Sequence, residues 1–488
     1  MEKSILKNSD LLKNAGYING QWIGADSKNR FDVKNAYSQE LIATLPEMGK
    51  TETNSAIEAA NTAWPAWRGK TAKERSTILM SWFNLIVENT EDLAKLMTLE
   101  QGKPLAESRG EVAYGSSFIQ WFAEEGKRTY GDIIPTPSND RRILAIKQPI
   151  GVVAAITPWN FPIAMITRKC APALAAGCPV VIKPAAETPL SALALAELAD
   201  QAGIPAGIIN VVVGTNAKEI GLALTDSPIV RKLSFTGSTA VGKILTKNCA
   251  DTMKKVSMEL GGNAPFIVFD DADLDKAIAG VMASKYRNTG QTCVCTNRIL
   301  AQEGIYNQFV EKLSEAVKSL NVGNGLEDGV SQGPLISNSA VEKVEEHIED
   351  AIAKGGVVIA GGKRHEKGGT LFEPTVIANA TIEMKVAKEE TFGPLAPVFK
   401  FSTEAEAIQM ANDTEFGLAS YFYTNDIGRV WRVSEALEYG MVGVNEGVIS
   451  NEVAPFGGVK ESGLGREGSH YGIDDFLELK YICMGGLK

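Results

Sequence analysis

The sequence predicts an α/β protein with more than one domain, in which short strands alternate with helices. The chain has 488 residues, which is more than a single hydrophobic core usually organises. Its composition, 44% apolar and 22% charged residues, is typical of a folded soluble protein. From Ile150 onward, short apolar runs alternate with segments of helical spacing, which favours crossover units and a parallel sheet buried on both faces.

The first 145 residues mix polar turns with amphipathic helices, which we expect over Thr51–Trp67 and Lys73–Leu96. A parallel sheet is expected next, with strands at Ile150–Ile156, Pro179–Lys183, Ile208–Val213 and Arg231–Phe235. Helices are expected between these strands at Ile163–Ala176 and Ala217–Thr225, and Gly237 opens another after the last strand. A further helix is expected to have Thr188 as its N-cap and Pro189 as its first residue, and to stop at Gly203. Sheets of this kind commonly bind nucleotides.

A second alternating region begins after Glu259, with a strand expected at Ala264–Phe269 and a helix at Asp273–Tyr286. Further strand and helix units run to about Val444, and they predict a second α/β domain. Glycine-rich turns then precede a polar, partly β-like tail, which would be free to pair with another chain.

Charge and cysteine content exclude several classes of protein. The net charge is −10 and no basic stripe is visible, so we expect no nucleic-acid partner. No apolar run is long enough to span a bilayer, and Met1–Leu11 does not resemble a signal peptide, so we expect no membrane partner. Six cysteines are too few for a disulfide scaffold, which favours free thiols in a reducing cytoplasm.

Cys293 is the candidate nucleophile. It follows a Gly-Gln-Thr turn among polar residues, as a partly exposed thiolate requires, although an isolated cysteine is more often a buried apolar residue. Cys295 completes a Cys-x-Cys pair, but with three histidines and no second cluster at zinc spacing we expect no metal. The scarcity of histidine also disfavours a cysteine–histidine protease or a serine hydrolase, and indicates a carboxylate as the general base.

Glu259 and Asn160 are the candidate base and oxyanion donor. Glu259 stands between apolar residues at the end of an expected strand, where partial burial would raise its pKa toward neutrality. A simple paired carboxylate is the alternative. Asn160 lies between Pro158 and Pro162, which restrict the backbone, so its amide could stabilise an oxyanion or could simply form an Asx turn.

The segment Phe235–Gly242 follows an expected strand and opens a helix, so its small residues and helix N–H groups could hold a pyrophosphate. It lacks the G-x-G-x-x-G fingerprint, and an ordinary strand-to-helix turn stays open as an interpretation. Lys183, at the end of its strand, could reach an adenosine ribose or could be a solvated surface residue.

A set of motifs, taken in order, resembles the aldehyde dehydrogenase superfamily. The motifs are Pro158–Pro162, Lys183–Ala185, Phe235–Ser238, Glu259–Gly262, Gly290–Cys293 and Glu390–Pro394. The resemblance implies that Cys293 is the nucleophile, Glu259 the base, and Asn160 with the Cys293 backbone N–H the oxyanion hole. It implies NADP or NAD as cofactor, bound by Thr157, Pro158, Trp159, Lys183, Ala186, Gly237, Ser238, Val241, Leu260, Glu390 and Phe392.

The resemblance also implies an architecture, the aldehyde dehydrogenase fold. A parallel-sheet, Rossmann-like dinucleotide-binding domain would comprise residues 1–134 and 152–259, and a second α/β domain, the catalytic one, residues 260–455. A small β oligomerisation element would comprise residues 135–151, which contain a hairpin, and the tail 470–488. This element would build a homo-oligomer, either a dimer or a tetramer.

Further stretches are similar to bacterial succinate-semialdehyde dehydrogenases, namely Ala164–Lys169, Asn263–Asp271, Cys293–Cys295 and Pro455–Ser469. This resemblance implies oxidation of succinate semialdehyde to succinate through a Cys293 thioester. It implies that Arg168, Arg287 and Ser450 grip the substrate carboxylate, whereas a structural salt bridge is the alternative for each arginine. It also implies a Cys293–Cys295 disulfide as a redox switch, which this spacing permits only if the loop rearranges.

Several alternatives stay open. The aldehyde substrate could instead be glutarate semialdehyde, betaine aldehyde or a simple aliphatic aldehyde, and acyl transfer to coenzyme A would leave Glu259 idle. A non-catalytic binding protein and a nucleotide-independent thiol esterase are alternatives outside this enzyme class. Ala186 stands where NAD-preferring relatives often carry Glu and NADP-preferring ones Ser, so it leaves the cofactor open and favours NADP only by removing a repelling carboxylate.

Overall fold

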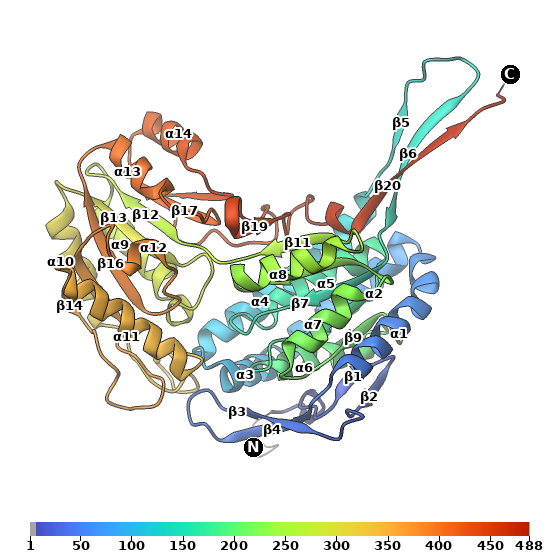
Figure 1. Ribbon diagram of the computed structural model, residues 1–488, viewed down its shortest axis with the longest axis horizontal. Coiled ribbons are helices and arrows are strands. Elements are labelled where there is room, and N and C mark those ends of the chain that lie inside the picture. Colours follow the sequence, from blue (N-terminus) through green and yellow to red (C-terminus); the bar gives the residue numbers. More distant parts are fainter. Residues whose placement is uncertain (1–5, 488) are drawn as a thin grey trace.

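The computed structural model describes residues 6–487, so the first five residues of the predicted first domain lie outside the described residues. Figure 1 shows two lobes side by side, with a β arm projecting from one of them. The first lobe contains the N-terminal half of the chain, and the second contains most of the C-terminal half. Within the described part of the chain, no helix is both long and apolar enough to cross a membrane.

The first lobe is built on a sheet with the strand order β19-β11-β10-β7-β8-β9-β1-β2. Its strands are β1 (Gly16–Ile18), β2 (Gln21–Ile23), β7 (Val152–Ile156), β8 (Val180–Lys183), β9 (Ile209–Val211), β10 (Val230–Thr236), β11 (Lys255–Glu259) and β19 (Gly463–Leu464). The strands from β9 to β11 run parallel, which confirms the predicted parallel sheet, whereas both edges are antiparallel. Because parallel strands end at one edge, the segments that follow β7, β10 and β11 meet there.

Helices pack on this sheet. They are α1 (Lys50–Arg68), α2 (Ala72–Glu88), α3 (Thr90–Gln101), α4 (Leu105–Glu125), α5 (Ala164–Ala176), α6 (Pro189–Gln201), α7 (Ala217–Asp226) and α8 (Thr239–Ala250). The single helix expected over Lys73–Leu96 is wrong, because the chain breaks between α2 and α3 at Asn89. The Asn89 side chain donates to the carbonyl of Leu85 at 2.8 Å and thereby ends α2.

The start of α6 also differs from the prediction. Pro189 is the first helical residue as expected, but the side chain of Thr188 makes no capping hydrogen bond. The Glu100 carboxylate, from the end of α3, instead accepts from the backbone N–H groups of Leu190 and Ser191, both at 2.8 Å. A buried carboxylate from a distant helix therefore caps α6, which local sequence does not reveal.

The second lobe is built on a sheet with the strand order β14-β15-β16-β13-β12-β17-β18, parallel except for the β14–β15 pair. Its strands are β12 (Ala264–Val268), β13 (Thr296–Gln302), β14 (Val357–Ala360), β15 (Thr375–Ala380), β16 (Leu395–Phe401), β17 (Ala419–Tyr423) and β18 (Met441–Val444). Its helices are α9 (Leu274–Lys285), α10 (Tyr306–Lys318), α11 (Asn338–Ala353), α12 (Lys385–Lys388), α13 (Glu404–Asn412) and α14 (Ile427–Ala436). The strand and helix expected after Glu259 are both present.

The arm consists of β5 (Asp132–Ile134), β6 (Arg142–Pro149) and β20 (Leu477–Met484) (Figure 1). The tail, which the sequence left free to pair with another chain, pairs antiparallel with β6 of its own chain along the whole of both strands. β5 precedes the predicted start of this element at residue 135, and Phe476 is buried in the core of the first lobe. A separate hairpin, β3 (Arg30–Lys34) and β4 (Leu41–Pro46), lies near the N-terminus.

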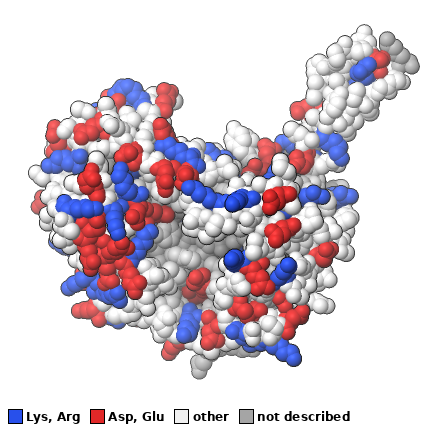
Figure 2. All heavy atoms as spheres, viewed as in Figure 1, with Lys and Arg blue, Asp and Glu red and all other residues white. Residues whose placement is uncertain are grey.

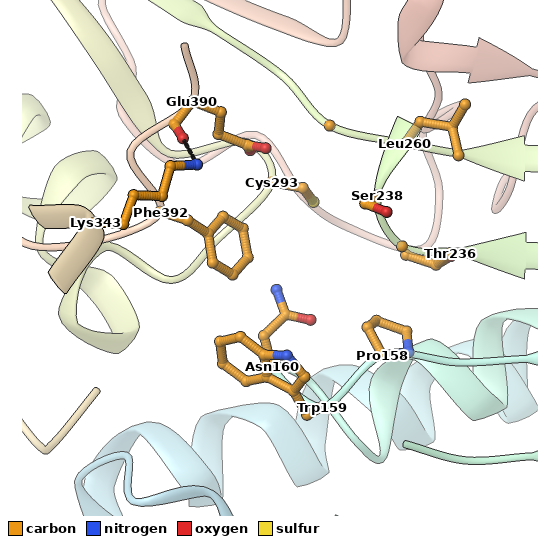
Figure 3. A pocket seen from close by; sticks show the side chains of 12 residues that line it. Pro158, Trp159, Asn160, Thr236, Ser238, Leu260, Cys293, Lys343, Glu390 and Phe392 are labelled. Atoms are coloured by element: carbon orange, nitrogen blue, oxygen red, sulfur yellow. Dashed lines mark hydrogen bonds between the residues drawn. The ribbon is translucent and has the colours of Figure 1, made fainter. Parts of the chain in front are cut away.

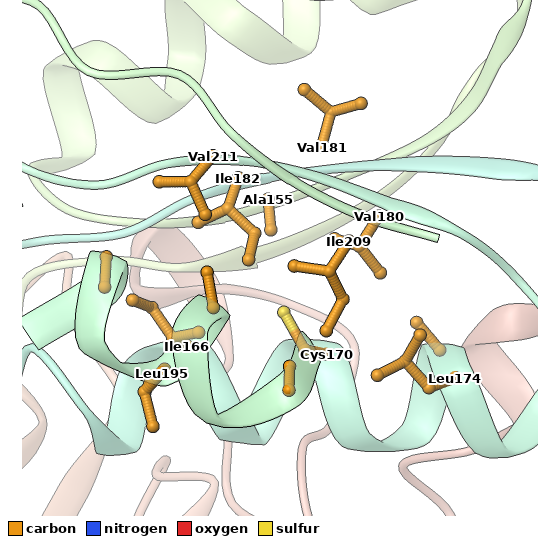
Figure 4. Packing of buried hydrophobic residues seen from close by; sticks show 14 of the residues in the cluster. Ala155, Ile166, Cys170, Leu174, Val180, Val181, Ile182, Leu195, Ile209 and Val211 are labelled. Carbon is orange, nitrogen blue, oxygen red and sulfur yellow. The ribbon is translucent and has the colours of Figure 1, made fainter. Parts of the chain in front are cut away.

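The core of the first lobe holds the catalytic edge of the sheet in position. Figure 4 shows Ile166, Cys170 and Leu174 of α5 packed beneath the sheet strands. Each of these side chains is at most 1% exposed, so Cys170 is an apolar core residue. Burial of such side chains stabilises the fold by about 1.5–3 kcal/mol each. The same helix carries Arg168 and Lys169, and Lys169 Nζ donates to the hydroxyl of Thr236 at the end of β10.

Candidate active site

A cavity of about 290 Å³ opens between the lobes. Its lining residues follow β7, β10 and β11 or come from the second lobe: Pro158, Trp159, Asn160, Thr236, Gly237, Ser238, Leu260, Gly261, Cys293, Lys343, Glu390 and Phe392. Figure 3 shows these side chains arranged around a shared space. On the face drawn in Figure 2, the surface is hollowed between the lobes, and basic side chains are interspersed with acidic ones.

Cys293 reaches the cavity because the loop before it has an unusual backbone. The short helical turn η4 (Arg287–Gly290) contains Asn288 and Thr289 in the left-handed region, with φ of 50° and 56°. Gly290 follows with φ of 76°, and a Cβ there would lie 2.1 Å from the carbonyl oxygen of Gly393. Only glycine therefore lets this loop pack against the Glu390–Gly393 segment.

The thiol of Cys293 is half-buried, and burial raises its pKa to about 12. The guanidinium groups of Arg168 and Arg287 oppose this shift, but they do not outweigh burial. The sequence predicts an electropositive setting that favours the thiolate. The structure places two positive charges near the thiol, but the pKa of the thiol stays raised, so the thiolate is not the main form. A base must consequently take the thiol proton during attack.

Glu259 is the last residue of β11 and is not among the residues that line the cavity. Its carboxylate is buried, and no hydrogen-bond partner reaches its Oε2 among the described residues. Burial, assisted by the negative charge of Glu467, raises the pKa of Glu259 well above its ordinary value, which confirms the predicted direction. Its charge also acts on Cys293, so the carboxyl group lies within electrostatic range of the thiol. This is the behaviour that a general base near neutral pH requires.

Asn160 is rigidly held on the other side of the cavity. Its side-chain Nδ2 donates to the carbonyl of Gln291 at 3.1 Å, and its own carbonyl accepts from Lys103 Nζ at 2.7 Å. The amide therefore bridges to the loop that carries Cys293, and an Asx turn is not formed. Its second N–H remains available for an oxyanion formed at Cys293.

The opposite wall of the cavity suits a nicotinamide ribose. Glu390 accepts from the backbone N–H of Gly262 at 3.3 Å, and burial raises the pKa of its carboxyl group to about 7. Lys343 Nζ, from α11, donates to the Glu390 carbonyl at 2.5 Å (Figure 3). Phe392, with φ of 57°, contacts Trp159 edge-to-face with ring centroids 5.6 Å apart.

The start of α8 is also fitted for a phosphate group. Ser238 caps the helix by accepting from the N–H of Val241 at 3.4 Å, and Val241 itself is 44% exposed. A Cβ at Gly237 would lie 2.4 Å from the ring of Phe235, and one at Gly242 would lie 2.4 Å from the side chain of Leu260. Glycine thus keeps the helix N-terminus open and close to the sheet.

Several predicted cofactor residues lie outside this cavity. Thr157 is buried, and its N–H donates to the carbonyl of Lys183 at 3.1 Å. Lys183 is buried too, which lowers its pKa, and its Nζ donates to the Pro184 carbonyl at 2.9 Å. Ala186 lines a separate hollow of about 260 Å³ together with Glu187 and Thr215. The residues predicted to bind the adenosine end of the cofactor therefore lie apart from the cavity that contains Cys293.

The predicted carboxylate clamp does not line the cavity, and Arg168 forms a buried salt bridge with Glu467, which is the alternative that the sequence left open. Arg168 is 1% exposed, and its guanidinium stacks over the ring of Phe456 at 3.9 Å. Arg287 is half-buried over the ring of Phe161 at 4.9 Å, and Ser450 is half-buried in the loop after β18. Both arginines act electrostatically on Cys293, so their charges converge on the thiol.

Sequence reasoning missed several residues of this site. Lys343 had no distinguishing signal, because it is one of several charged residues on α11. Glu467 lies inside a stretch that carried the resemblance, yet its ion pair with Arg168 at 2.6 Å follows only from the fold. Cys293 and Cys295 are free thiols, and Cys295 Sγ donates to the Lys285 carbonyl at 3.1 Å, so a disulfide would need a different loop conformation.

Comparison with known proteins agrees with this geometry. The family model described as "Aldehyde dehydrogenase family" matches residues 22–482. The chain is 62% identical over 480 residues to a succinate-semialdehyde dehydrogenase [NADP(+)] of Escherichia coli (strain K12), covering 98% of this chain and 99% of that protein. It is 62% identical over 482 residues to a glutarate-semialdehyde dehydrogenase of Pseudomonas aeruginosa, covering 99% and 100%.

A solved structure shares the fold. The crystal structure of an NADP-dependent enzyme from E. coli superposes with a TM-score of 0.98 at 62% identity, covering 98% of this chain and 100% of that chain. The family match, these relatives and a cavity lined by a cysteine and an amide lead to one conclusion: the chain belongs to the aldehyde dehydrogenase family.

Proposed function

We propose that the enzyme oxidises succinate semialdehyde to succinate, with Cys293 as nucleophile, Asn160 as oxyanion donor and Glu259 as base. The observation that carries the proposal is that the Cys293 thiol and the Asn160 amide line one cavity, while the Glu259 carboxyl group, whose pKa is raised, lies within electrostatic range of the thiol. The nicotinamide end of NADP or NAD would occupy the same cavity, because the start of α8, the half-buried Glu390 side chain and the Trp159–Phe392 pair line it. The bound nicotinamide would supply the hydride acceptor.

In the proposed mechanism, the Cys293 thiol passes its proton to water as it attacks, which leaves the Glu259 carboxylate free for the later hydrolysis step. The sulfur then forms a bond to the aldehyde carbon, and the carbonyl electron pair moves onto oxygen. Asn160 Nδ2 and the Cys293 backbone N–H donate to that oxyanion. Loss of hydride leaves a thioester on Cys293. Glu259 then takes a proton from water, whose oxygen attacks the thioester carbon and breaks the carbon–sulfur bond.

The substrate class follows from charge. Both relatives named above act, by their names, on aldehydes that carry a terminal carboxylate. Arg287 would grip that group, with Ser450 as a further donor, because a guanidinium group binds a carboxylate with two parallel hydrogen bonds. Arg168 is already paired with Glu467 and would act on the substrate through its charge. Glutarate semialdehyde is the second candidate, supported by the identity to the Pseudomonas enzyme.

The experiment is a matrix of aldehydes against cofactors. Succinate semialdehyde, glutarate semialdehyde and an uncharged aldehyde of similar length are each tested with NADP and with NAD, and reduced cofactor is followed by absorbance. The proposal requires the highest kcat/KM for succinate semialdehyde, and the names of the E. coli relative and of the E. coli structure support NADP as the preferred cofactor. Equal kcat/KM for the uncharged aldehyde would refute the anionic substrate class, and absence of cofactor reduction with every aldehyde would refute the mechanism.

Assembly and location belong to the same proposal. The arm exposes large apolar side chains, among them Ile133 at 81%, Leu479 at 69% and Tyr481 at 65%. Such a surface is costly in water, so we propose that it is covered in a dimer or tetramer of this chain. The dinucleotide would bind to residues 1–134 and 152–259, and the cysteine would act from residues 260–455. A reducing cytoplasm would keep the catalytic thiol free.

A further inference from the structure

A buried polar network lies behind the oxyanion hole, and the mechanism above does not use it. Lys103 follows α3, is 1% exposed, and donates from Nζ to the Asn160 carbonyl at 2.7 Å and to the Glu111 carboxylate. Its ammonium also lies 3.9 Å from the centre of the Phe161 ring. Burying a lysine ammonium destabilises the fold unless the charge is paired and hydrogen-bonded. Here the hydrogen bond of Lys103 to the Asn160 carbonyl also fixes the backbone of Asn160.

Asn288 reaches the same carbonyl from the second lobe. Its side-chain Nδ2 donates to the Asn160 carbonyl at 3.0 Å and to the Gln291 carbonyl at 3.3 Å. The Gln291 carbonyl also receives the catalytic amide of Asn160 at 3.1 Å. Asn288 therefore connects the loop that carries the oxyanion donor to the loop that carries Cys293, two residues beyond Gln291.

Two further hydrogen bonds hold Asn288 itself in place. Its backbone N–H donates to the Glu107 carboxylate at 2.7 Å, and its Oδ1 accepts from Gln101 Nε2 at 3.0 Å. Its backbone is left-handed, with φ of 50°, and its side chain is completely buried. Because Oδ1 has a donor and Nδ2 has two acceptors, the amide can bond in only one orientation.

We infer that Asn288, supported by Lys103, is a positioning residue of the oxyanion hole. It holds Asn160 so that one amide N–H stays on Gln291 and the other points toward the oxygen that becomes negative at Cys293. Preorganised donors stabilise such an oxyanion, and a displacement of about 1 Å can cost about 100-fold in rate. This inference rests on the proposed function.

The primary test is Asn288→Gly. Glycine accepts the left-handed backbone, so the change removes the two side-chain donors without adding strain. We expect kcat to fall about tenfold or more, with unchanged KM for the cofactor and an unchanged rate of Cys293 alkylation by iodoacetamide. Asn379→Gly is the matched control, because Asn379 is also left-handed, with φ of 55°, but is exposed on β15. A kcat equal to that of the control would overturn the inference.

A second measurement separates positioning from a general structural role. In an Asn160→Ala background, Asn288→Gly should cause little further loss of the single-turnover rate, because the group that it positions is already absent. Multiplicative losses in the double variant would overturn the inference while leaving the proposed function intact. An unmodified enzyme that turned over no aldehyde would overturn both.

If thermal unfolding measurements show that the Asn288→Gly variant is not folded, Asn288→Asp replaces it in the same comparison. Aspartate keeps the shape and the left-handed backbone but turns the Nδ2 donor into an acceptor facing two carbonyls. In the enzyme with Asn160 unchanged, we expect Asn288→Asp to lower kcat at least as much as Asn288→Gly would. In the Asn160→Ala variant, we again expect little further loss. Loss of the same factor in both backgrounds would refute the inference.

Discussion

Arg168 and Glu467 form an ion pair, with 2.6 Å between Nη2 and Oε2, in which the side chains are only 1% and 6% exposed. The same carboxylate also binds Lys169, whose Nζ donates to the hydroxyl of Thr236 at 2.6 Å on the cavity wall. Two neighbouring cations of α5 are thus paired with one carboxylate from the C-terminal segment, which balances one of their two charges. The charge that reaches the catalytic cavity therefore depends on Glu467.

Replacing Glu467 with Gln should destabilise the fold strongly. Arg168 and Lys169 would remain buried without a negatively charged partner, and breaking a buried ion pair in this way typically costs about 3–5 kcal/mol. The measurement is the free energy of unfolding in denaturant. The matched control is Glu461→Gln, whose pair with Lys243 is 36% and 60% exposed. Water screens that exposed pair, so its loss should destabilise the fold little, and equal losses for the two variants would contradict the prediction.

Replacing Cys293 with Ala should abolish aldehyde oxidation while cofactor binding, measured by fluorescence titration, stays intact. Cys483→Ser is the control, because Cys483 is exposed on the arm and should leave turnover unchanged. Burial raises the pKa of Cys293 to about 12, so alkylation of the unmodified enzyme should accelerate steadily from pH 6 to pH 9, about tenfold per pH unit. Residual turnover in the alanine variant would require another nucleophile.

Replacing Glu259 with Gln should mainly slow release of the acid. The acyl-enzyme would then accumulate, and a burst of reduced cofactor should precede a slow steady state. Because burial raises the pKa of Glu259, the unmodified enzyme should gain activity as pH rises and the carboxyl group loses its proton. The Gln variant should lose that dependence. A normal steady-state rate in the variant would indicate a different base.

Replacing Arg287 with Ala should lower kcat/KM about 100-fold for succinate semialdehyde, since a charged hydrogen bond contributes about 1.5–3 kcal/mol. An uncharged aldehyde of similar length should lose far less. Arg287→Lys serves as the control, because it keeps the charge but cannot form two parallel hydrogen bonds. Equal losses for both aldehydes would remove Arg287 from the clamp.

The raised pKa of the Glu390 carboxyl group predicts that cofactor binding depends on pH. Burial raises the pKa of Glu390 to about 7, so the carboxyl group is protonated below that pH and ionised above it. The ionised form accepts hydrogen bonds from ribose hydroxyls more strongly, and KM for the cofactor should therefore fall as pH rises through about 7. Glu390→Gln should flatten this curve. A KM that stays pH-dependent in the variant would assign the titration elsewhere.

The sequence alone determined the alternation of strands and helices, and with it the parallel sheet of the first lobe. It also determined which residues follow the strand ends, because Asn160, Gly237 and Leu260 come directly after apolar runs. Local pattern is sufficient for these features, since the side-chain period of a strand and the glycine at a tight turn are properties of adjacent residues.

Only the tertiary structure decided how these residues are held and charged. The break at Asn89, the cap of α6 by Glu100 and the pair of Arg168 with Glu467 join or divide segments in ways that no local pattern encodes. The network of Lys103 and Asn288 likewise joins residues 57 and 128 positions away from Asn160. Burial and long-range contacts set the energies of polar groups, and both exist only after the two lobes pack together.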